Sequence, residues 1–312
     1  IMGEDIGPKG GVYGVTQKLS HTFGPDRVIN TLLDEQSILG LAIGLSHNGF
    51  IPIPEIQFLA YLHNAEDQIR GEAATLPFFS NGQFSNPMVI RIAGLGYQKG
   101  FGGHFHNDNS LAVLRDIPGI IIACPSHGAD AAAMLRECVR LARDEQRVVV
   151  FIEPIALYAM RDLHEDKDGG WMQKYPEPGK TIPIGEVGVT GKGPLAIITY
   201  ANGHYLSQKA TRMLSQQGIE TRIIDLRWID PLPVNSILDA IKGAKKVLIV
   251  DECRETGSQS EAILSMLTEH CSLPTARLAA EDSFIATGPA YAATMPSVES
   301  ITNAAIKLWK DT

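Results

Sequence analysis

The sequence predicts an α/β protein of two parallel-sheet domains, each a three-layer unit with its sheet between helices. Short, mainly apolar runs, such as residues 195–200, are typical of strands buried on both faces of a sheet. These runs alternate with helical periods of about 10 to 15 residues, the pattern of right-handed β-α-β crossovers. Residues 162–180, rich in Asp, Lys, Gly and Pro, have the composition of a surface linker. We therefore expect one domain over residues 1–180 and another over residues 181–312.

Strands and helices alternate regularly in the second half, from residue 194 onward. The first helix has apolar residues at helical spacing and ends before Gly218, a residue type that favours a helix end. The next helix follows Pro231-Leu232-Pro233. The expected strands are 195–200, 221–226, 246–251 and 275–278, and the other expected helices are 206–214 and 260–267.

The first half has the same character with longer loops between its elements. The chain opens on Ile1-Met2-Gly3, which we interpret as the tail of a strand. Apolar runs and helical periods in this half indicate strands at 87–91, 120–124 and 148–152, and helices at 37–45, 59–74 and 129–142.

Charge and composition exclude several classes of partner. The formal net charge is −8, and no basic run offers an electrostatic footprint for nucleic acid or for an anionic membrane. No apolar stretch approaches the roughly 20 residues of a membrane helix, and no secretion signal opens the chain. The four cysteines lack C-x-x-C spacing, so we expect reduced thiols in a cytoplasmic protein, or in the mitochondrial matrix if the source is a eukaryote.

A glycine-rich segment runs from Gly94 to Gly103. A dinucleotide fingerprint requires G-x-G-x-x-G at the start of a helix, and here the third glycine is one residue late and a further glycine pair follows. The segment also lacks the Gly-Lys-Ser/Thr of a phosphate-binding P-loop. We therefore expect a mobile loop rather than a phosphate cradle.

Two chemistries are open for the segment that follows this loop. His104, His106 and Asp108 have an H-x-H-x-D spacing that suits the zinc ligands of a metallohydrolase. Asn109 stands where that motif usually continues with a further histidine. The same imidazoles are equally suited to acid–base catalysis in a cleft near neutral pH.

Two further segments combine polar and apolar residues at the ends of predicted elements. Asp34 and Glu35 precede an apolar helix. Asp34 is expected to cap the N-terminus of this helix. Glu35 is either a favourable charge at the positive end of the helix dipole or a buried functional carboxylate. Gln57, Phe58 and Tyr61 follow a predicted strand end and belong either to the core or to the pocket of a planar ring.

Together these segments resemble the beta subunit of the thiamine-diphosphate-dependent 2-oxo acid dehydrogenases, the decarboxylating component of those complexes. The resemblance covers nearly the whole chain and implies a transketolase-like pyrimidine-binding domain followed by a transketolase C-terminal domain. It also implies that the family's first helix and strand lie before residue 1. The matching stretches are 3–7, 10–12, 23–28, 31–40, 54–58, 82–84, 102–106, 151–154, 224–227, 231–232 and 295–298.

The resemblance assigns roles to individual residues. Glu35 matches the glutamate that hydrogen-bonds N1′ of the aminopyrimidine and so promotes deprotonation of the thiazolium C2, although Leu32 and Asp34 depart from the family motif. His106 matches a histidine that transfers protons during acyl passage to lipoyl groups, but residues 107–109 replace the family's Ser-Gln-Ser. Gln57, Phe58 and Tyr61 are the expected pyrimidine-pocket residues. Departures near residues 144–147 and 153–155 leave the family's structural potassium ion unassigned, so no metal site is predicted.

The resemblance also implies cofactors and partners. The expected cofactors are thiamine diphosphate and Mg²⁺, and no Gly-Asp-Gly motif of the kind that holds the metal and the diphosphate occurs in this sequence. We expect an alpha subunit or fused alpha region to hold them, in an α2β2-like heterotetramer with a second beta copy. The other expected partners are a lipoyl-bearing acyltransferase core and a small 2-oxo acid substrate. The motifs favour the branched-chain (2-oxoisovalerate) branch for this substrate. The alternatives are a transketolase-like sugar-transferring enzyme, the zinc hydrolase and a non-catalytic assembly module.

Overall fold

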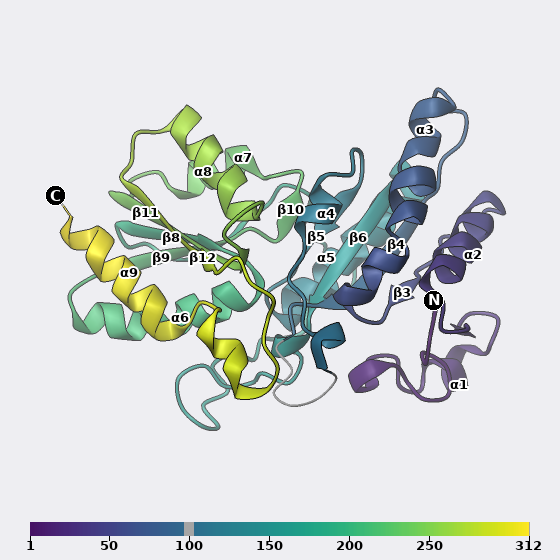
Figure 1. Cartoon of the computed structure of the whole chain (residues 1–312), viewed down its shortest axis with the longest axis horizontal. Helices are drawn as coiled ribbons and strands as arrows, with labels where there is room; N and C mark the ends of the chain where they lie inside the picture. Colours follow the sequence, from purple (N-terminus) through teal and green to yellow (C-terminus); the bar gives the residue numbers. More distant parts are fainter. Residues whose placement is uncertain (97–102, 312) are drawn as a thin grey trace.

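A computed structural model describes residues 1–96 and 103–311, arranged as two α/β halves side by side (Figure 1). Each half is built around a five-stranded sheet, with strand orders β10-β5-β6-β4-β3 and β12-β11-β8-β9-β7. A separate two-stranded ribbon joins β1 (Met2–Gly3) to β2 (Ile29–Asn30) in parallel. The central residues of the predicted glycine-rich loop, 97–102, lie outside the described ranges.

The first sheet consists of four parallel strands and one antiparallel edge strand. The parallel strands are β3 (Glu55–Ile56), β4 (Met88–Gly94), β6 (Val148–Pro154) and β5 (Ile121–Ala123). The edge strand β10 (Trp228–Asp230) comes from the second half of the chain and pairs antiparallel with β5. The sequence analysis missed this strand, because three residues after a loop carry no periodic signal.

Both faces of this sheet are covered by helices, as predicted. Alternate residues of β4 point to opposite faces, so Val89 packs with α5 (Gly128–Glu145), whereas Ile90 packs with α2 (Glu35–His47). Both side chains are fully buried. Full burial of such a side chain stabilises a fold by about 1.5–3 kcal/mol, which explains why the central strands are apolar on both faces.

The second sheet repeats this three-layer arrangement. Its parallel strands are β8 (Leu195–Thr199), β9 (Thr221–Asp225), β11 (Lys246–Arg254) and β12 (Thr275–Ala280), and β7 (Gly188–Gly191) is an antiparallel edge. Helices α6 (Ala201–Gln216) and α9 (Val298–Lys310) cover one face, and α7 (Val234–Ala240) and α8 (Gln259–His270) cover the other.

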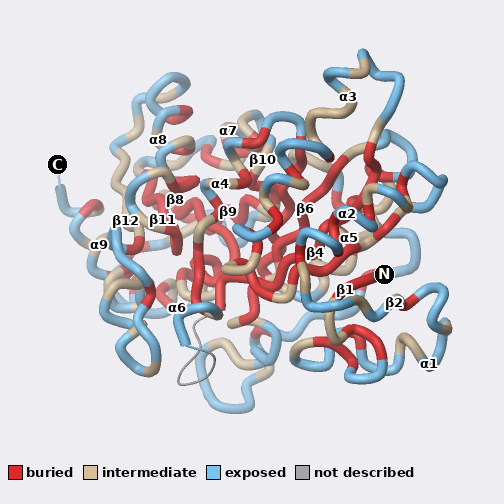
Figure 2. The backbone as a smooth tube through the Cα atoms, turned by 45° about the vertical axis from the view of Figure 1, so that its right-hand side comes forward, coloured by how far each residue is buried: buried red, intermediate tan, exposed pale blue. Residues whose placement is uncertain are grey.

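The two halves share one apolar core. A single cluster of buried side chains runs from Ile38 and Ile90 in the first half to Ile198 and Ile249 in the second. Figure 2 shows this buried backbone continuing through the centre of the molecule. Together with the exchange of β10, this core makes the joint between the halves a packed interface.

The predicted helix over residues 59–74 is wrong in type. The segment forms a 3-10 helix, η2 (Leu59–Asn64), and a π-helix, η3 (Gln68–Ala73). The buried residues Leu59, Leu62 and Ala65 are three apart, which suits the three residues per turn of a 3-10 helix. Apolar spacing therefore identified the buried face but not the kind of helix.

The remaining elements are short. They are η1 (Val12–Gly14), α1 (Leu19–Phe23), α3 (Thr75–Phe79), η4 (Gly103–His106), α4 (Ala112–Arg115), η5 (Ile155–Leu157) and η6 (Gly288–Ala293). All four cysteines are free, and all but the half-buried Cys271 are buried. Within the described ranges, the model contains no helix with the length and apolar character needed to cross a membrane.

Candidate functional site

Glu35 begins helix α2 and is only 3% exposed. The preceding residue, Asp34, occupies the N-cap position with extended backbone, and its carboxylate accepts a hydrogen bond from the Ser37 hydroxyl instead of from a backbone N–H. The positive end of the helix dipole favours a carboxylate in the first turn. Glu35 forms no ion pair within the described residues 1–96 and 103–311, so this buried carboxyl group is suited to a ligand.

The surroundings of Glu35 are acidic. In the described part of the chain, the one hydrogen-bond donor to its carboxylate is the Asn64 amide, at 3.4 Å. Burial and the negative charges of Asp5 and Glu35 raise the pKa of Glu4 above its usual value. A partly buried group of acids favours a ligand that carries a positive charge or several N–H donors. Glu4 was not among the predicted site residues, although the motif around residues 3–7 contains it.

An aromatic cluster lies next to this acidic group. The ring centroids of Phe58 and His106 are 4.4 Å apart, and those of Phe58 and Tyr61 are 5.5 Å apart. All three rings meet edge to face. The Tyr61 hydroxyl lies 3.1 Å from Nε2 of His106. Burial, together with the charges of Glu4 and Glu35, raises the pKa of Tyr61, so this hydroxyl stays protonated near neutral pH.

The structure therefore gathers most of the predicted site residues. Phe58, Tyr61 and His106 are in contact, and Asn64, which donates to the Glu35 carboxylate at 3.4 Å, belongs to the same helix η2 as Tyr61. Gln57 instead points to the β1–η1 loop, where its side-chain amide lies 3.5 Å from the Asp5 carboxylate. An aromatic wall beside acidic groups is complementary to a planar heterocycle with amino substituents.

Within the part of the chain that the structure describes, His104, His106 and Asp108 do not come together as the zinc alternative requires. His104 is exposed and its ring lies over Phe105, with 3.8 Å between the ring centroids. Asp108 is buried and accepts hydrogen bonds from the backbone and hydroxyl of Ser110, at 3.1 and 2.6 Å. Outside residues 97–102 and 312, the structure holds no group of three or more His, Cys, Asp or Glu side chains placed to bind a metal.

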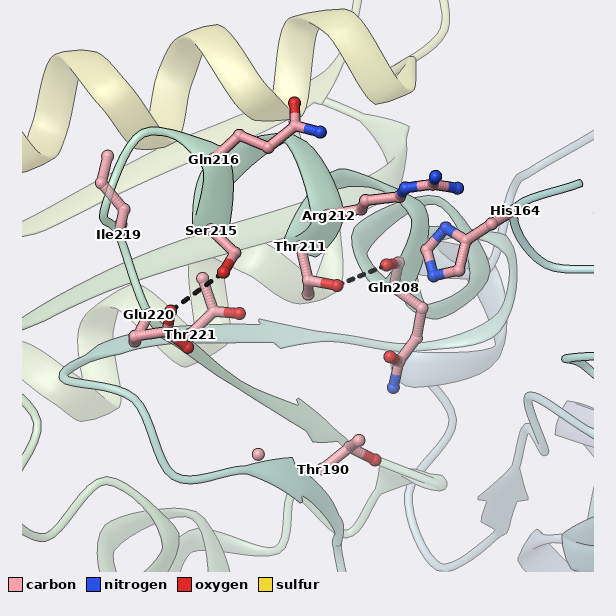
Figure 3. A pocket seen from close by; sticks show the side chains of 11 residues that line it. His164, Thr190, Gln208, Thr211, Arg212, Ser215, Gln216, Ile219, Glu220 and Thr221 are labelled. Carbon is pink, nitrogen blue, oxygen red and sulfur yellow. Dashed lines mark hydrogen bonds between the residues drawn. The ribbon is translucent and has the colours of Figure 1, made fainter.

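A surface cavity of about 550 Å³ lies on the C-terminal half (Figure 3). Its lining is mostly polar, and several of the side chains already have partners. Ser215 donates to Glu220 at 3.0 Å, Thr211 donates to the Gln208 carbonyl at 2.7 Å, and Arg212 donates to Glu165 at 2.9 Å. None of the predicted site residues contributes to this cavity.

Comparison with known families and structures agrees with this geometry. Residues 1–160 match the transketolase pyrimidine binding domain, and residues 187–301 match the transketolase C-terminal domain. A solved split-gene transketolase, described as an inactive beta4 tetramer, superposes with a TM-score of 0.74 at 19% identity, over 99% of this chain and 91% of its own. The two domain matches, together with the shared fold, define a protein of the transketolase type.

Similarity to curated relatives shows which family within this class the chain belongs to. The pyruvate dehydrogenase E1 component subunit beta of Bacillus subtilis (strain 168) is 30% identical, covering 99% of this chain and 91% of the relative. The protein of that name from Staphylococcus aureus (strain Mu50 / ATCC 700699) is 34% identical, with 91% and 84% covered. The 2-oxoisovalerate dehydrogenase subunit beta of Bacillus subtilis (strain 168) is 33% identical, with 90% and 83% covered. The chain belongs to the E1 beta subunits of the 2-oxo acid dehydrogenases, which confirms the predicted family, fold and enzyme class.

Proposed function

We propose that this chain holds the pyrimidine half of thiamine diphosphate in a decarboxylating E1 component, with Glu35 as its catalytic carboxylate. The observation that carries the proposal is the buried Glu35 at the start of α2, which accepts a hydrogen bond from Asn64 of η2, the helix that also contains Tyr61. When bound, thiamine diphosphate supplies an electron sink for decarboxylation of a 2-oxo acid. The chain's own residues bind and orient the ring and control its protonation.

Each residue has a distinct task in this proposal. The Glu35 carboxylate accepts a hydrogen bond from a protonated ring nitrogen, N1′, because it is buried and has spare accepting capacity. Phe58 and Tyr61 form the apolar wall for the flat ring. Gln57, whose amide lies 3.5 Å from the Asp5 carboxylate, acts through the acidic group beside this wall. His106, hydrogen-bonded to Tyr61, transfers protons when the acyl group passes to a lipoyl group.

The diphosphate and its Mg²⁺ are assigned to an alpha partner, either a separate subunit or a fused region. Mg²⁺ requires several oxygen ligands. Across residues 1–96 and 103–311, no cluster of three His, Cys, Asp or Glu side chains offers them. Leu32 and Leu33, which precede Asp34 and Glu35, are 83% and 69% exposed, so an apolar surface borders the site and is suited to burial by that partner. We further propose a second beta copy in an α2β2-like assembly and a lipoyl-bearing acyltransferase core as the acyl acceptor.

The proposed substrate is a small 2-oxo acid. The relatives named for pyruvate and for 2-oxoisovalerate have nearly equal identity to this chain, 34% and 33%. We therefore do not extend the sequence-based preference for the branched-chain branch beyond this class.

An activity assay of the complete enzyme tests the proposal. The chain is co-expressed with its alpha partner and supplied with thiamine diphosphate, Mg²⁺, lipoyl domain and either pyruvate or 2-oxoisovalerate. We expect CO₂ release and acylation of the lipoyl domain with at least one 2-oxo acid, and no reaction without the cofactor. Transfer of a two-carbon unit to an aldose in place of lipoyl acylation would instead indicate a transketolase.

Replacing His106 by alanine separates the two half-reactions. We expect lipoyl acylation to fall about 100-fold or more, since positioned acid–base groups contribute on that scale, with a much smaller loss of decarboxylation coupled to an artificial electron acceptor. His270→Ala, at an exposed position at the end of α8, is the control for removal of an imidazole. An equal fall in both half-reactions of His106→Ala contradicts a role in acyl transfer.

A further inference from the structure

The three residues that follow His106 are buried although all are polar. Asn107, Asp108 and Asn109 are 7%, 9% and 1% exposed. Buried polar side chains are almost always hydrogen-bonded, so a run of three requires dedicated partners. Residues 107–109 are also where this chain departs from the Ser-Gln-Ser of the resembling family.

Several partners of this segment lie on the C-terminal half, in addition to His63 of η2, whose Nε2 lies 3.4 Å from the Asp108 carboxylate. Asn109 donates its side-chain amide to the backbone carbonyl of Glu252 at 2.7 Å, and Asn107 donates to the carbonyl of Ala286 at 3.4 Å. Arg254 donates to the Ser110 hydroxyl at 2.9 Å, and its guanidinium lies 3.5 Å from the Asp108 carboxylate. The residues next to His106 are therefore attached to β11 and to the loop after β12.

The same part of the C-terminal half also binds the residue that follows strand β4, Leu95. Asn202, near the start of α6, donates its side-chain amide to the carbonyl of Leu95 at 2.9 Å. The Glu252 carboxylate in turn accepts hydrogen bonds from the backbone and side chain of Asn202. All of these side chains are buried. The Asn202–Glu252 pair therefore contacts both Leu95, through the Asn202 amide, and Asn109, through the Glu252 carbonyl.

We propose that Asn202, Glu252 and Arg254 are positioning residues that hold the segment of His106 against Phe58 and Tyr61. Removal of this attachment frees the imidazole from the 3.1 Å contact with the Tyr61 hydroxyl without touching the Glu35 carboxylate. The C-terminal domain thereby sets the geometry of acyl transfer, while decarboxylation depends on the pyrimidine domain. This inference rests on the proposed role of His106.

Substitution of Asn109 and Arg254 tests the attachment in the enzyme assembled with its alpha partner and thiamine diphosphate. The measurements are backbone hydrogen exchange over residues 106–114 and the ratio of lipoyl acylation to dye-coupled decarboxylation. For Asn109→Ala and Arg254→Ala we expect exchange to become about tenfold faster and the ratio to fall about tenfold, the scale of one buried hydrogen bond. Arg254→Lys keeps the charge near Asp108 and is expected to recover part of the ratio.

Matched controls separate positioning from a general loss of stability. Asn86 is 1% exposed and also donates to backbone carbonyls, but those are Glu72 and Ala73 of the pyrimidine domain. Arg277 binds Glu255 within the C-terminal domain. Asn86→Ala and Arg277→Ala are expected to leave both the ratio and the exchange of residues 106–114 unchanged.

Two results would overturn the inference: unchanged exchange over residues 106–114 in Asn109→Ala, or faster exchange with an unchanged ratio. If Asn109→Ala does not assemble, Asn109→Ser keeps a shorter donor and provides the same comparison. Failure of the proposed function is recognised separately, because His106→Ala would then leave the ratio of acylation to decarboxylation unchanged. The exchange measurement still decides whether the C-terminal domain holds the segment.

Discussion

Glu35→Gln is expected to slow exchange of the C2 proton of bound thiamine diphosphate by about 10²- to 10⁴-fold, the usual contribution of a positioned acid–base group. Glutamine has nearly the size of glutamate but lacks the negative charge that stabilises a protonated ring nitrogen. The side chain is buried and its donor Asn64 is an uncharged amide, so in Glu35→Gln neither of these two groups carries a charge toward the ring. Proton–deuterium exchange in the assembled enzyme measures the effect, and CO₂ release is expected to fall with it.

The control is the same substitution at an equally buried glutamate. Glu137 on helix α5 is also 3% exposed, and it pairs with Arg140 at 2.6 Å. Glu137→Gln is expected to leave proton exchange of the cofactor normal, whatever its effect on stability. Normal exchange in Glu35→Gln would remove Glu35 from the catalytic residues, even if the fold and the family assignment stand.

Arg91→Met is expected to lower the free energy of unfolding by about 3–5 kcal/mol, the cost of breaking a buried ion pair from one side. The Arg91 guanidinium donates to Glu55 at 2.7 Å and to both carboxylate oxygens of Glu153, at 2.6 and 2.9 Å. Burial opposes the charge of Arg91, but Glu153 and Glu55 still raise its pKa above the ordinary value. Without the arginine, the buried Glu55 at the start of β3 and the partly buried Glu153 near the end of β6 lose their shared cation. Denaturant unfolding of the purified chain measures the loss.

Two further variants test the electrostatic cause. Arg143 forms an exposed pair with Asp144, and because exposed pairs contribute little, Arg143→Ala is expected to change stability only slightly. Changing Glu55 and Glu153 to glutamine in the Arg91→Met background removes the uncompensated charges and is expected to recover part of the loss. No recovery in this triple variant would show that lost packing, rather than buried charge, causes the destabilisation.

The candidate site was predictable from sequence only in part. Glu35 could be found because a carboxylate at the start of an apolar helix, within a recognisable motif, is a local signal. The contact between Tyr61 and His106 could not, because it joins residues 45 positions apart. Glu4 had no role in the sequence analysis, since its effect depends on burial beside Asp5 and Glu35.

The sequence by itself determined the alternation of strands and helices, the buried faces and the family, because periodicity and ordered motifs are properties of short stretches. Tertiary structure alone decided that β10 joins the sheet of the other half and that the polar residues after His106 are buried. The partners of Asn109 and Asn107 lie 143 and 179 residues away. Such hydrogen bonds form only where packing excludes water and brings distant backbone carbonyls within reach, which no local pattern encodes.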